Sequence, residues 1–457
     1  MATAAMLGGC TVGANYARPQ MPIPAEHRFV QNTSQAASLA DAPWFQVFDD
    51  PMLQALIKEA LANNLDLQAA VARVEEARAR AGIARSFLYP QVEGVANYTV
   101  RQATDSTPRI TGNEGNTEQT GVYGFQLAWE IDLFGRIRRQ TEAAVALALA
   151  SEQGRRGVMV TLVGDVATNY FLLRELDLQL EIARRTLAAN DATVEYFQTR
   201  LAGGVSNRLE LDRIQANRSR TAATIPDLEQ QTAVVENAIS LLLGRSPGPI
   251  SRTPLATTEA TPPEIPADMP AKLLERRPDV VQAEQLLVAA NADIGVAKSL
   301  FFPAISLTGF LGGISGELSN FLGSDGGVWS VGPSLLQPIF QGGRLRRNLE
   351  ASRARFDIAF ADYRKSALNA YREVANSLVT IQKLAEGRAH REAGVAVLQD
   401  ATELSRARYD AGLSSYLEIL TADERLFDEQ LLLAQNRGAE LRARAELYRA
   451  LGGGWQP

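Results

Sequence analysis

The chain has 457 residues, a formal net charge of −6, one cysteine and two histidines. The negative charge argues against a nucleic-acid partner, and so few cysteines and histidines argue against a disulfide, a metal centre or histidine catalysis. No run of 18 apolar residues occurs, which excludes a transmembrane helix but leaves membrane-spanning β-strands open.

The amino terminus carries the only cysteine, Cys10, in the sequence Leu7-Gly8-Gly9-Cys10. This segment resembles a bacterial lipobox, so residues 1–9 are expected to be the remnant of a signal peptide and Cys10 to carry lipid such as palmitate. The alternative is a chance L-G-G-C in an unstructured tail, and the short stretch before Cys10 is a departure from the pattern. The Pro-rich stretch that follows favours the lipobox. Position 11 is a threonine and not an aspartate. By resemblance to bacterial lipoproteins, this favours anchoring in the outer membrane.

The chain contains two copies of one domain plan, residues 63–244 and 276–452. Asp66, Gly82 and Pro90 match Asp279, Gly295 and Pro303 at an offset of 213, and later motifs match at an offset of 208. So long a period indicates a duplicated domain and not a solenoid. The remaining parts are a tether and equatorial segment over 10–62, a Pro/Thr-rich linker over 245–275 and a tail over 453–457.

Each copy reads as a helix, two strands and two long helices. The first copy predicts strands at about 91–101 and 121–132 and helices at about 136–200 and 209–243; the second predicts strands at about 303–313 and 327–340 and helices at about 344–408 and 415–449. Apolar and polar residues alternate in the strands, from Val92 to Val100 and from Tyr123 to Ile131, and more weakly through Trp329, Val331, Leu335 and Ile339. Polar, Gly-rich segments at 101–120 and 314–327 are typical of external barrel loops.

Four strands of this length cannot close a barrel, and open sheet edges are not tolerated in lipid. Two copies of the chain would supply eight strands, and side chains fill the interior of a barrel of that size. Three copies would supply twelve strands. A conduit therefore requires at least three copies.

Three long blocks carry a resemblance to a known family: "RRPDVVQAEQLLVAANADIGVAKSLFFPAISLTGFLGG", "PIFQGGRLRRNLEASRARFDIAFADYRKSALNAYREVANSL" and "RYDAGLSSYLEILTADERLF". They resemble the outer-membrane factors of tripartite efflux systems, of the TolC/OprM type and its lipoprotein branch associated with RND-type pumps. The resemblance implies a mixed α and β membrane protein. Its homotrimer would form a 12-stranded outer-membrane β-barrel, continuous with a periplasmic α-helical barrel and surrounded by an equatorial domain. The implied partners are a periplasmic adaptor, an inner-membrane RND-type pump and outer-membrane lipid.

Two turn motifs, Gly203-Gly204-Val205-Ser206 and Ala411-Gly412-Leu413-Ser414, join the long helices. Glycine ends a helix in a left-handed conformation and serine caps the next one, so these motifs predict helical hairpins. The resemblance further implies that the turns form the periplasmic tip and contact the adaptor, through Gly203, Gly204, Ser206, Gly412, Leu413 and Ser414.

The resemblance places a constriction just after the second turn, at Leu417, Glu418 and Thr421, with Asp423 and Glu424 as the next candidates. Many relatives carry an aspartate where Thr421 stands, so Glu418 is the alternative source of a charged ring. The sequence leaves a second interpretation open for Leu417, because a heptad row through Leu413, Leu417 and Leu420 puts it in a helix seam.

Six arginines lie at the starts of the two longest helices, where cations oppose the helix dipole. These are Arg136, Arg138, Arg139, Arg344, Arg346 and Arg347. Phosphates of the inner leaflet are one expected partner. A solvated face with Glu142 and Glu350 nearby is the other, and the sequence favours neither.

The sequence carries no Walker A, H-E-x-x-H or G-x-S-x-G motif, so no enzyme activity is expected. The predicted function is a passive exit channel for multidrug efflux, gated at its periplasmic tip. The alternatives are the exit channel of a type I protein-secretion system and a coiled-coil lipoprotein without a pore.

Overall fold

The computed structural model of the chain describes residues 11–21, 50–102, 117–253, 270–316 and 327–453. The expected signal remnant, Cys10, most of both loops between the strands and the last four residues lie outside this part. The chain divides into two compact units, 1–20 with 73–152 and 282–364, and 21–72 with 153–281 and 365–457. Each unit therefore draws on both copies of the duplicated plan.

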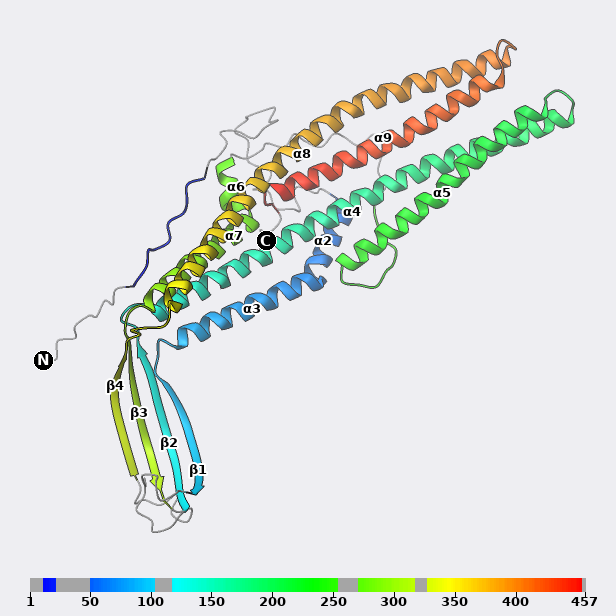
Figure 1. Cartoon of the computed structure of the whole chain (residues 1–457). Helices are drawn as coiled ribbons and strands as arrows, with labels where there is room; N and C mark the ends of the chain where they lie inside the picture. Colours follow the sequence, from blue (N-terminus) through cyan, green and yellow to red (C-terminus); the bar gives the residue numbers. More distant parts are fainter. Residues whose placement is uncertain (1–10, 22–49, 103–116, 254–269, 317–326, 454–457) are drawn as a thin grey trace. The chain divides into compact units, whose positions relative to one another are not determined.

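The first unit contains one four-stranded antiparallel sheet in the order β1-β2-β3-β4, drawn in Figure 1. The strands are β1 Gln91–Gln102, β2 Thr117–Ile131, β3 Ala304–Ser315 and β4 Gly327–Leu336. The first copy supplies β1 and β2, and the second supplies β3 and β4. Since β1 and β4 are the outer strands, each has one edge with no strand partner within the described chain.

Cross-strand partners point to the same side of a sheet, so the register divides the side chains between two faces. Val92 pairs with Leu127, Leu127 with Gly309, and Gly309 with Val331. We call the side that these residues share the apolar face; it also carries Tyr98, Val100, Phe125, Trp129, Leu307, Leu311, Trp329 and Leu335. The opposite side, the polar face, carries most of the polar residues and some apolar ones: Glu93, Asn97, Thr99, Gln126, Glu130, Ser306, Thr308, Ser330 and Ser334, with Phe310, Val95, Val122 and Val328 among them. Trp329 remains 76% exposed in the single chain, so the apolar face is not covered by the protein's own core.

Two strand ends differ from the sequence prediction. β4 stops at Leu336, before Ile339, because Pro338 has no backbone N–H to donate to a ladder. There the side-chain amide of Gln337 donates to the carbonyls of Phe301 and Pro338 instead. β2 starts at Thr117, earlier than predicted, and its first residues pair with β1. The sequence did not indicate a strand there, because the polar stretch before Gly121 shows no apolar alternation.

Two glycines allow β2 and β3 to approach closely. Gly124, with φ +153°, lies opposite Gly312. A Cβ on Gly312 would overlap the carbonyl oxygen of Tyr123, and one on Gly124 would overlap that of Leu311. No other residue fits at this point of the sheet.

The helices repeat in matched lengths, which supports the duplication. They are α2 Pro51–Asn63, α3 Leu65–Ser86, α4 Arg136–Ala202, α5 Arg208–Leu242, α6 Pro270–Arg276, α7 Pro278–Ser299, α8 Arg344–Asp410 and α9 Tyr416–Ala450. α3 and α7 have 22 residues each, α4 and α8 have 67, and α5 and α9 have 35. No helix of the described residues is long and apolar enough to cross a membrane.

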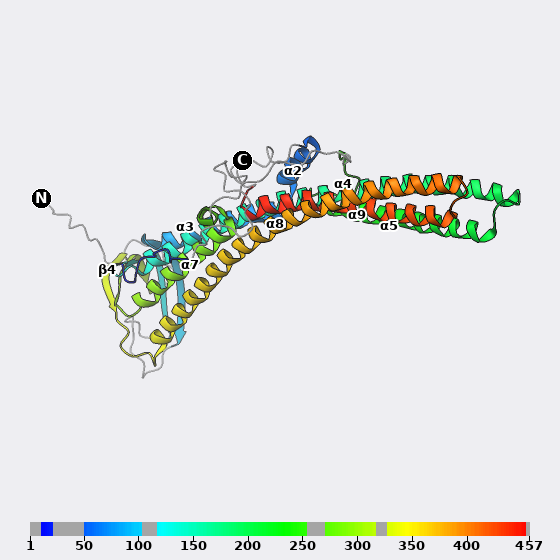
Figure 2. The same ribbon diagram turned by 90° about the horizontal axis from the view of Figure 1, so that it is seen from above.

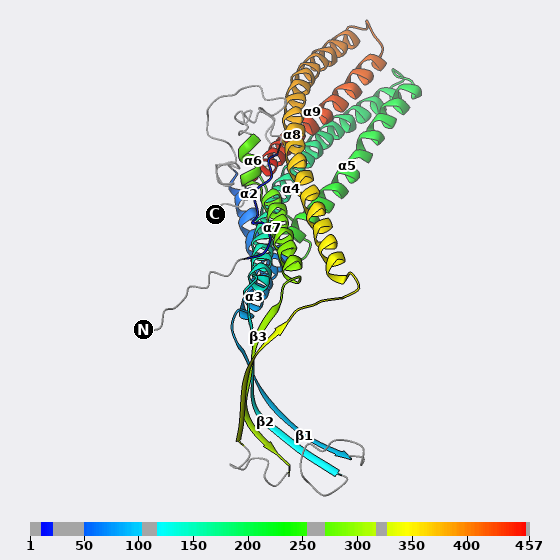
Figure 3. The ribbon, with the colours of Figure 1, turned by 60° about the vertical axis from the view of Figure 1, so that its left-hand side comes forward.

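In the second unit, the later parts of α4 and α8 run beside α5 and α9 (Figures 2 and 3). Their core includes Ile57 of α2, Tyr170 and Leu173 of α4, Ile239 of α5 and Tyr448 of α9, all almost fully buried. In α9 the heptad row is buried at Phe427, Ala434, Ala445 and Tyr448. Apolar burial along these seams is the main stabilisation of such long helices.

Ion pairs fix the linker residues of the second unit. Arg252 bonds both Asp177 of α4 and Glu236 of α5, and these hydrogen bonds raise the pKa of its guanidinium. Arg277, between α6 and α7, donates to the carbonyl of Ala450 and pairs with Glu373. Arg252 of the linker is thus bonded to α4 and α5, and Arg277, just after the linker, to the carboxyl end of α9.

Candidate functional site

The two turns between the long helices have the same geometry. After α4, the Gly204 N–H donates to the Leu201 carbonyl and the Val205 N–H to the Arg200 carbonyl. After α8, Gly412 and Leu413 repeat these bonds to Tyr409 and Arg408. Gly204 and Gly412 have φ of +74° and +71°. This is the Schellman arrangement, which requires a left-handed residue and so explains both glycines.

The residues after the turns differ from the expected serine caps. The cap of α5 is Asn207, whose side chain accepts from the Glu210 N–H, while Ser206 donates to the Glu210 carboxylate at 2.7 Å. The cap of α9 is Ser415, and its side chain makes no capping bond. Each serine of the predicted motifs lies one residue too early to cap, because the chain needs one further extended residue before the next helix.

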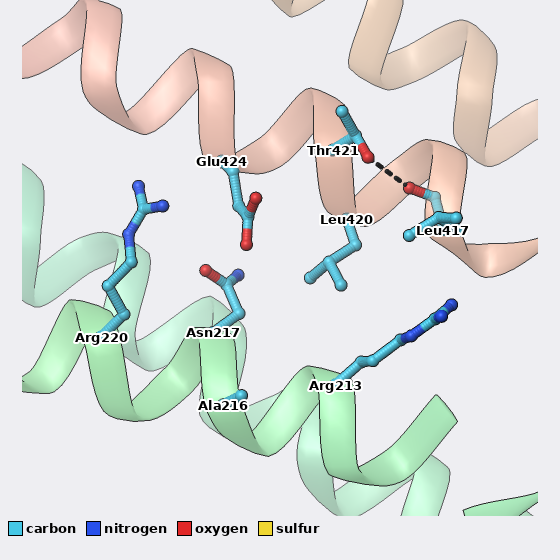
Figure 4. A pocket seen from close by; sticks show the side chains of 8 residues that line it. All are labelled: Arg213, Ala216, Asn217, Arg220, Leu417, Leu420, Thr421 and Glu424. Carbon is cyan, nitrogen blue, oxygen red and sulfur yellow. Dashed lines mark hydrogen bonds between the residues drawn. The ribbon is translucent and has the colours of Figure 1, made fainter. Parts of the chain in front are cut away.

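A pocket of about 410 Å³ lies between α5 and α9 near the second turn (Figure 4). Three predicted gate residues, Leu417, Thr421 and Glu424, line it from α9, with Leu420 beside them. Arg213, Ala216, Asn217 and Arg220 line it from α5. The sequence reasoning missed this arginine side, although Arg213 and Arg220 share a seven-residue spacing that puts them on one helix face.

The charges of this pocket are only partly paired. Arg220 pairs with Asp428 at 2.6 Å. Among the described residues, neither Arg213 nor Glu424 makes a hydrogen bond or ion pair. Figure 4 shows Glu424 pointing from α9 toward Asn217 of α5. Within the described chain, the pocket therefore holds an unpaired carboxylate and an unpaired guanidinium.

The other gate candidates are turned toward α8. Glu418 lies 3.6 Å from Arg408, and Asp423 lies 3.2 Å from Arg406. Burial raises the pKa of the Asp423 carboxyl above its ordinary value, although Arg406 acts in the opposite direction. Leu417 is 47% exposed, so within one chain it does not occupy the buried seam that its heptad position suggested.

An aromatic cluster that the sequence reasoning did not single out joins the two hairpins near the turns. Phe197 of α4 is fully buried and packs against Tyr409 of α8 and Tyr416 of α9. Arg200 donates to the Tyr409 hydroxyl at 2.9 Å and lies over the rings of Tyr196 and Phe197. Burial raises the pKa of Tyr416 to about 12. The available sequence signal was the pair Tyr196-Phe197 before the first turn motif and the tyrosines Tyr409 and Tyr416 on either side of the second.

The arginines at the start of α4 are bonded within the first unit. Arg136 pairs with Glu130 at 2.6 Å, and Arg138 pairs with Asp132, whose carboxylate also accepts the backbone N–H groups of Ile137 and Arg138 in the first turn of α4. Arg139 is 2% exposed. The expectation that Arg139 contacts lipid phosphate is therefore wrong, because its guanidinium is buried and already has its acceptors.

Those acceptors come mostly from the segment that follows Cys10. Arg139 donates to the carbonyls of Val12 and Gly13 and to the side chain of Asn15. We call residues 11–18 the strap. Its other end is fixed by Glu284 of α7, which accepts from both Tyr16 and Arg18. The strap begins beside Gly135, where a Cβ would lie 2.5 Å from the Thr11 side chain.

The arginines at the start of α8 have a different environment. Arg346 is 82% exposed in its side chain, Arg347 is similarly exposed, and both pair with Glu350. Arg344 donates to Gln341. Exposed pairs of this kind are worth little, so these side chains remain available to another anion.

The family model for outer membrane efflux proteins matches residues 56–245 and 269–453 of the chain. The two matched segments correspond to the two copies of the duplicated plan. The chain therefore belongs to the outer membrane efflux protein family.

Individual relatives agree along almost the whole length. The chain is 34% identical to the cation efflux system protein CusC of Escherichia coli O6:H1, over 98% of this chain and 97% of the relative. It is 34% identical to the probable efflux pump outer membrane protein TtgC of Pseudomonas putida, over 99% and 94%. The solved outer-membrane channel OprN matches with a TM-score of 0.89 and 32% identity, over 98% of this chain and 100% of OprN.

These findings confirm the fold class of the chain, its function as an outer-membrane efflux channel and its location in the outer membrane with extension into the periplasm. The relatives are channel and efflux proteins and not enzymes. The roles of the individual gate and turn residues, and lipid contact by the predicted arginines other than Arg139, stay predictions.

Proposed function

We propose that three copies of this chain form a passive exit duct for small molecules, closed at rest at its periplasmic tip. The observation that carries the gated duct is the pocket of Leu417, Thr421 and Glu424 facing the arginines of α5. A periplasmic adaptor and an inner-membrane RND-type pump open the tip and supply the energy.

The unpaired edges of β1 and β4 in the described sheet support the trimer. Backbone groups left without a partner in lipid are costly, so these edges must pair with strands of other copies. Three copies supply twelve strands and leave a lumen, whereas two would give a barrel filled by side chains. The apolar face then meets lipid and the polar face lines the lumen.

The two Schellman turns support an adaptor contact at Gly203, Gly204, Ser206, Gly412, Leu413 and Ser414. Leu413 is largely exposed beside Gly412, and a Cβ on either Gly204 or Gly412 would meet no atom of the described chain within 4 Å. Open backbone of this kind permits close packing of a partner helix.

In the first unit, Arg344, Arg346 and Arg347 bind lipid phosphates. Among the described residues, the carboxylate that pairs with Arg346 and Arg347 is the partly exposed Glu350, and Arg344 donates only to the neutral Gln341. Their charge is therefore weakly compensated by the chain itself.

Lipidation of Cys10 is supported by the strap, which starts at the next residue and holds the chain beside the junction of β2 and α4. We predict that Cys10→Ser abolishes labelling with radioactive palmitate in cells, while wild type is labelled. Equal labelling of both would contradict the lipobox.

The gate is tested by single-channel conductance in planar bilayers. Leu417→Ala combined with Glu418→Ala removes an apolar ring and a charged ring, so resting conductance is expected to rise severalfold. Thr199→Ala, on α4 before the first turn, is the control and should conduct like wild type. An unchanged conductance with an intact trimer would place the constriction elsewhere, and Glu424→Ala is then the next variant.

A further inference from the structure

The polar face of the sheet brings three chemically different side chains into one row. Glu93 of β1 pairs with Gln126 of β2, and Gln126 pairs with Phe310 of β3. Their positions on one face follow from the register. Adjacent strands lie about 4.8 Å apart, so Glu93 and Phe310 are separated by ~10 Å across Gln126.

Glu93 is an exposed carboxylate that makes no hydrogen bond or ion pair with any described residue. Glu130, which the register places on the same face, is neutralised by Arg136. The negative charge of Glu93 is therefore available to a ligand in the lumen.

Phe310 is the one aromatic side chain that the register of the described strands places on this face. It is half-buried, and its Cζ atom lies 2.9 Å from where a Cβ of Gly312 would be. The ring thus lies over a stretch of wall where Gly312 and Gly124 provide no side chains. It offers a large aromatic surface, whereas the other apolar side chains that the register places on this face, such as Val95 and Val328, are aliphatic.

We propose that the row Glu93–Gln126–Phe310 is a binding site for amphiphilic organic cations that pass through the duct. The carboxylate attracts the cationic group, and the ring of Phe310 contacts the apolar part of the same molecule. The site rests on the proposed trimer, in which three identical rows face one lumen. Charge complementarity favours cations over anions of the same shape, and the ring favours aromatic cations over small ones.

The probe is phenyltrimethylammonium, added from the extracellular side of wild-type channels in planar bilayers. Tetramethylammonium carries the same charge without the ring, and benzyl alcohol carries a ring without the charge. Block of single-channel conductance should be strongest for phenyltrimethylammonium. Glu93→Gln should raise its half-blocking concentration about 5- to 10-fold, and Phe310→Leu about 3- to 5-fold. Phe310→Leu should leave block by tetramethylammonium unchanged.

Ser330→Ala is the matched control, because Ser330 ends the same row on β4 without charge or ring. It should behave like wild type, and every variant is first checked for the wild-type mass in detergent. If wild type conducts but Glu93→Gln and Phe310→Leu are blocked as wild type is, the row is not a binding site. If wild type forms no conducting channel, the proposed duct fails, and the row fails with it.

Discussion

Arg139 shows how one buried side chain organises a segment far away in sequence. Its guanidinium bonds Val12, Gly13 and Asn15 of the strap and also Glu142 of its own helix. A buried cation is tolerated only when its donors are satisfied. If the strap leaves its place, the Arg139 guanidinium loses three of its acceptors, so the strap and Arg139 stabilise each other's position.

We predict that Arg139→Met releases the strap. The methionine keeps the apolar stem but loses the hydrogen bonds to Val12, Gly13 and Asn15, and each such bond is worth about 1 kcal/mol or more. Chymotrypsin should then cleave after Tyr16 at least about tenfold faster than in wild type, measured by mass spectrometry of the amino-terminal fragment.

Arg346→Met serves as the control for this experiment, because Arg346 is exposed and bonds only Glu350 among the described residues. Its cleavage should match wild type. Equal protection of Tyr16 in Arg139→Met would mean that Glu284 and the glycine contacts hold the strap without Arg139.

At the residue scale, the sequence identified the gate candidates as a group, and the structure separates them. Leu417, Thr421 and Glu424 are spaced by four and three residues, so they share one face of α9 and line the pocket with α5. Glu418 and Asp423 lie on other faces and pair with arginines of α8. The partner helix of each face could not be read from α9 alone.

At the scale of elements, glycines determine how the strands and turns fit together. The sheet is tightest between β2 and β3, where Gly312 faces Gly124. A Cβ added to Gly94 of β1, in contrast, would meet no atom of the described chain within 4 Å. Both positions are glycines of the same sheet, but only Gly94 has room for a Cβ.

We therefore predict that Gly312→Ala destabilises the assembled protein, while Gly94→Ala has little effect. The Cβ on residue 312 would overlap the Tyr123 carbonyl, and relieving such a clash costs about 1–3 kcal/mol. The thermal midpoint of trimer dissociation in mild detergent should fall by several degrees for Gly312→Ala only. Equal midpoints would show that β2 and β3 separate without penalty.

At the scale of the whole molecule, one chain provides only part of a membrane structure. The described sheet has two unpaired edges and an apolar face that the chain's own core does not cover. Both features require neighbouring chains and lipid.

We predict that the purified protein in mild detergent has the mass of three chains, determined by light scattering or native mass spectrometry. Closure of the sheet is the physical reason, because each added copy pairs one β4 edge with one β1 edge. A stable monomer that inserts into lipid would contradict the trimer and the duct together.

Much of this architecture was determined by the sequence alone. The duplication, the two hairpins and the apolar side of the strands follow from periodicities along the chain, and local patterns are sufficient to specify them. The strand ends at Thr117 and Leu336 were missed, because pairing at a strand end depends on the partner strand and on where Pro338 removes a donor.

Only the tertiary structure decided which distant residues share a site. Each of three such pairings joins residues more than 100 positions apart in the chain: Arg139 with the strap, Arg213 and Arg220 with Glu424, and Glu93 with Phe310. Hydrophobic periodicity specifies which face of an element is buried, but not which element covers it or which charge it meets there. Those pairings depend on strand register and helix packing, which arise only when the whole chain has folded.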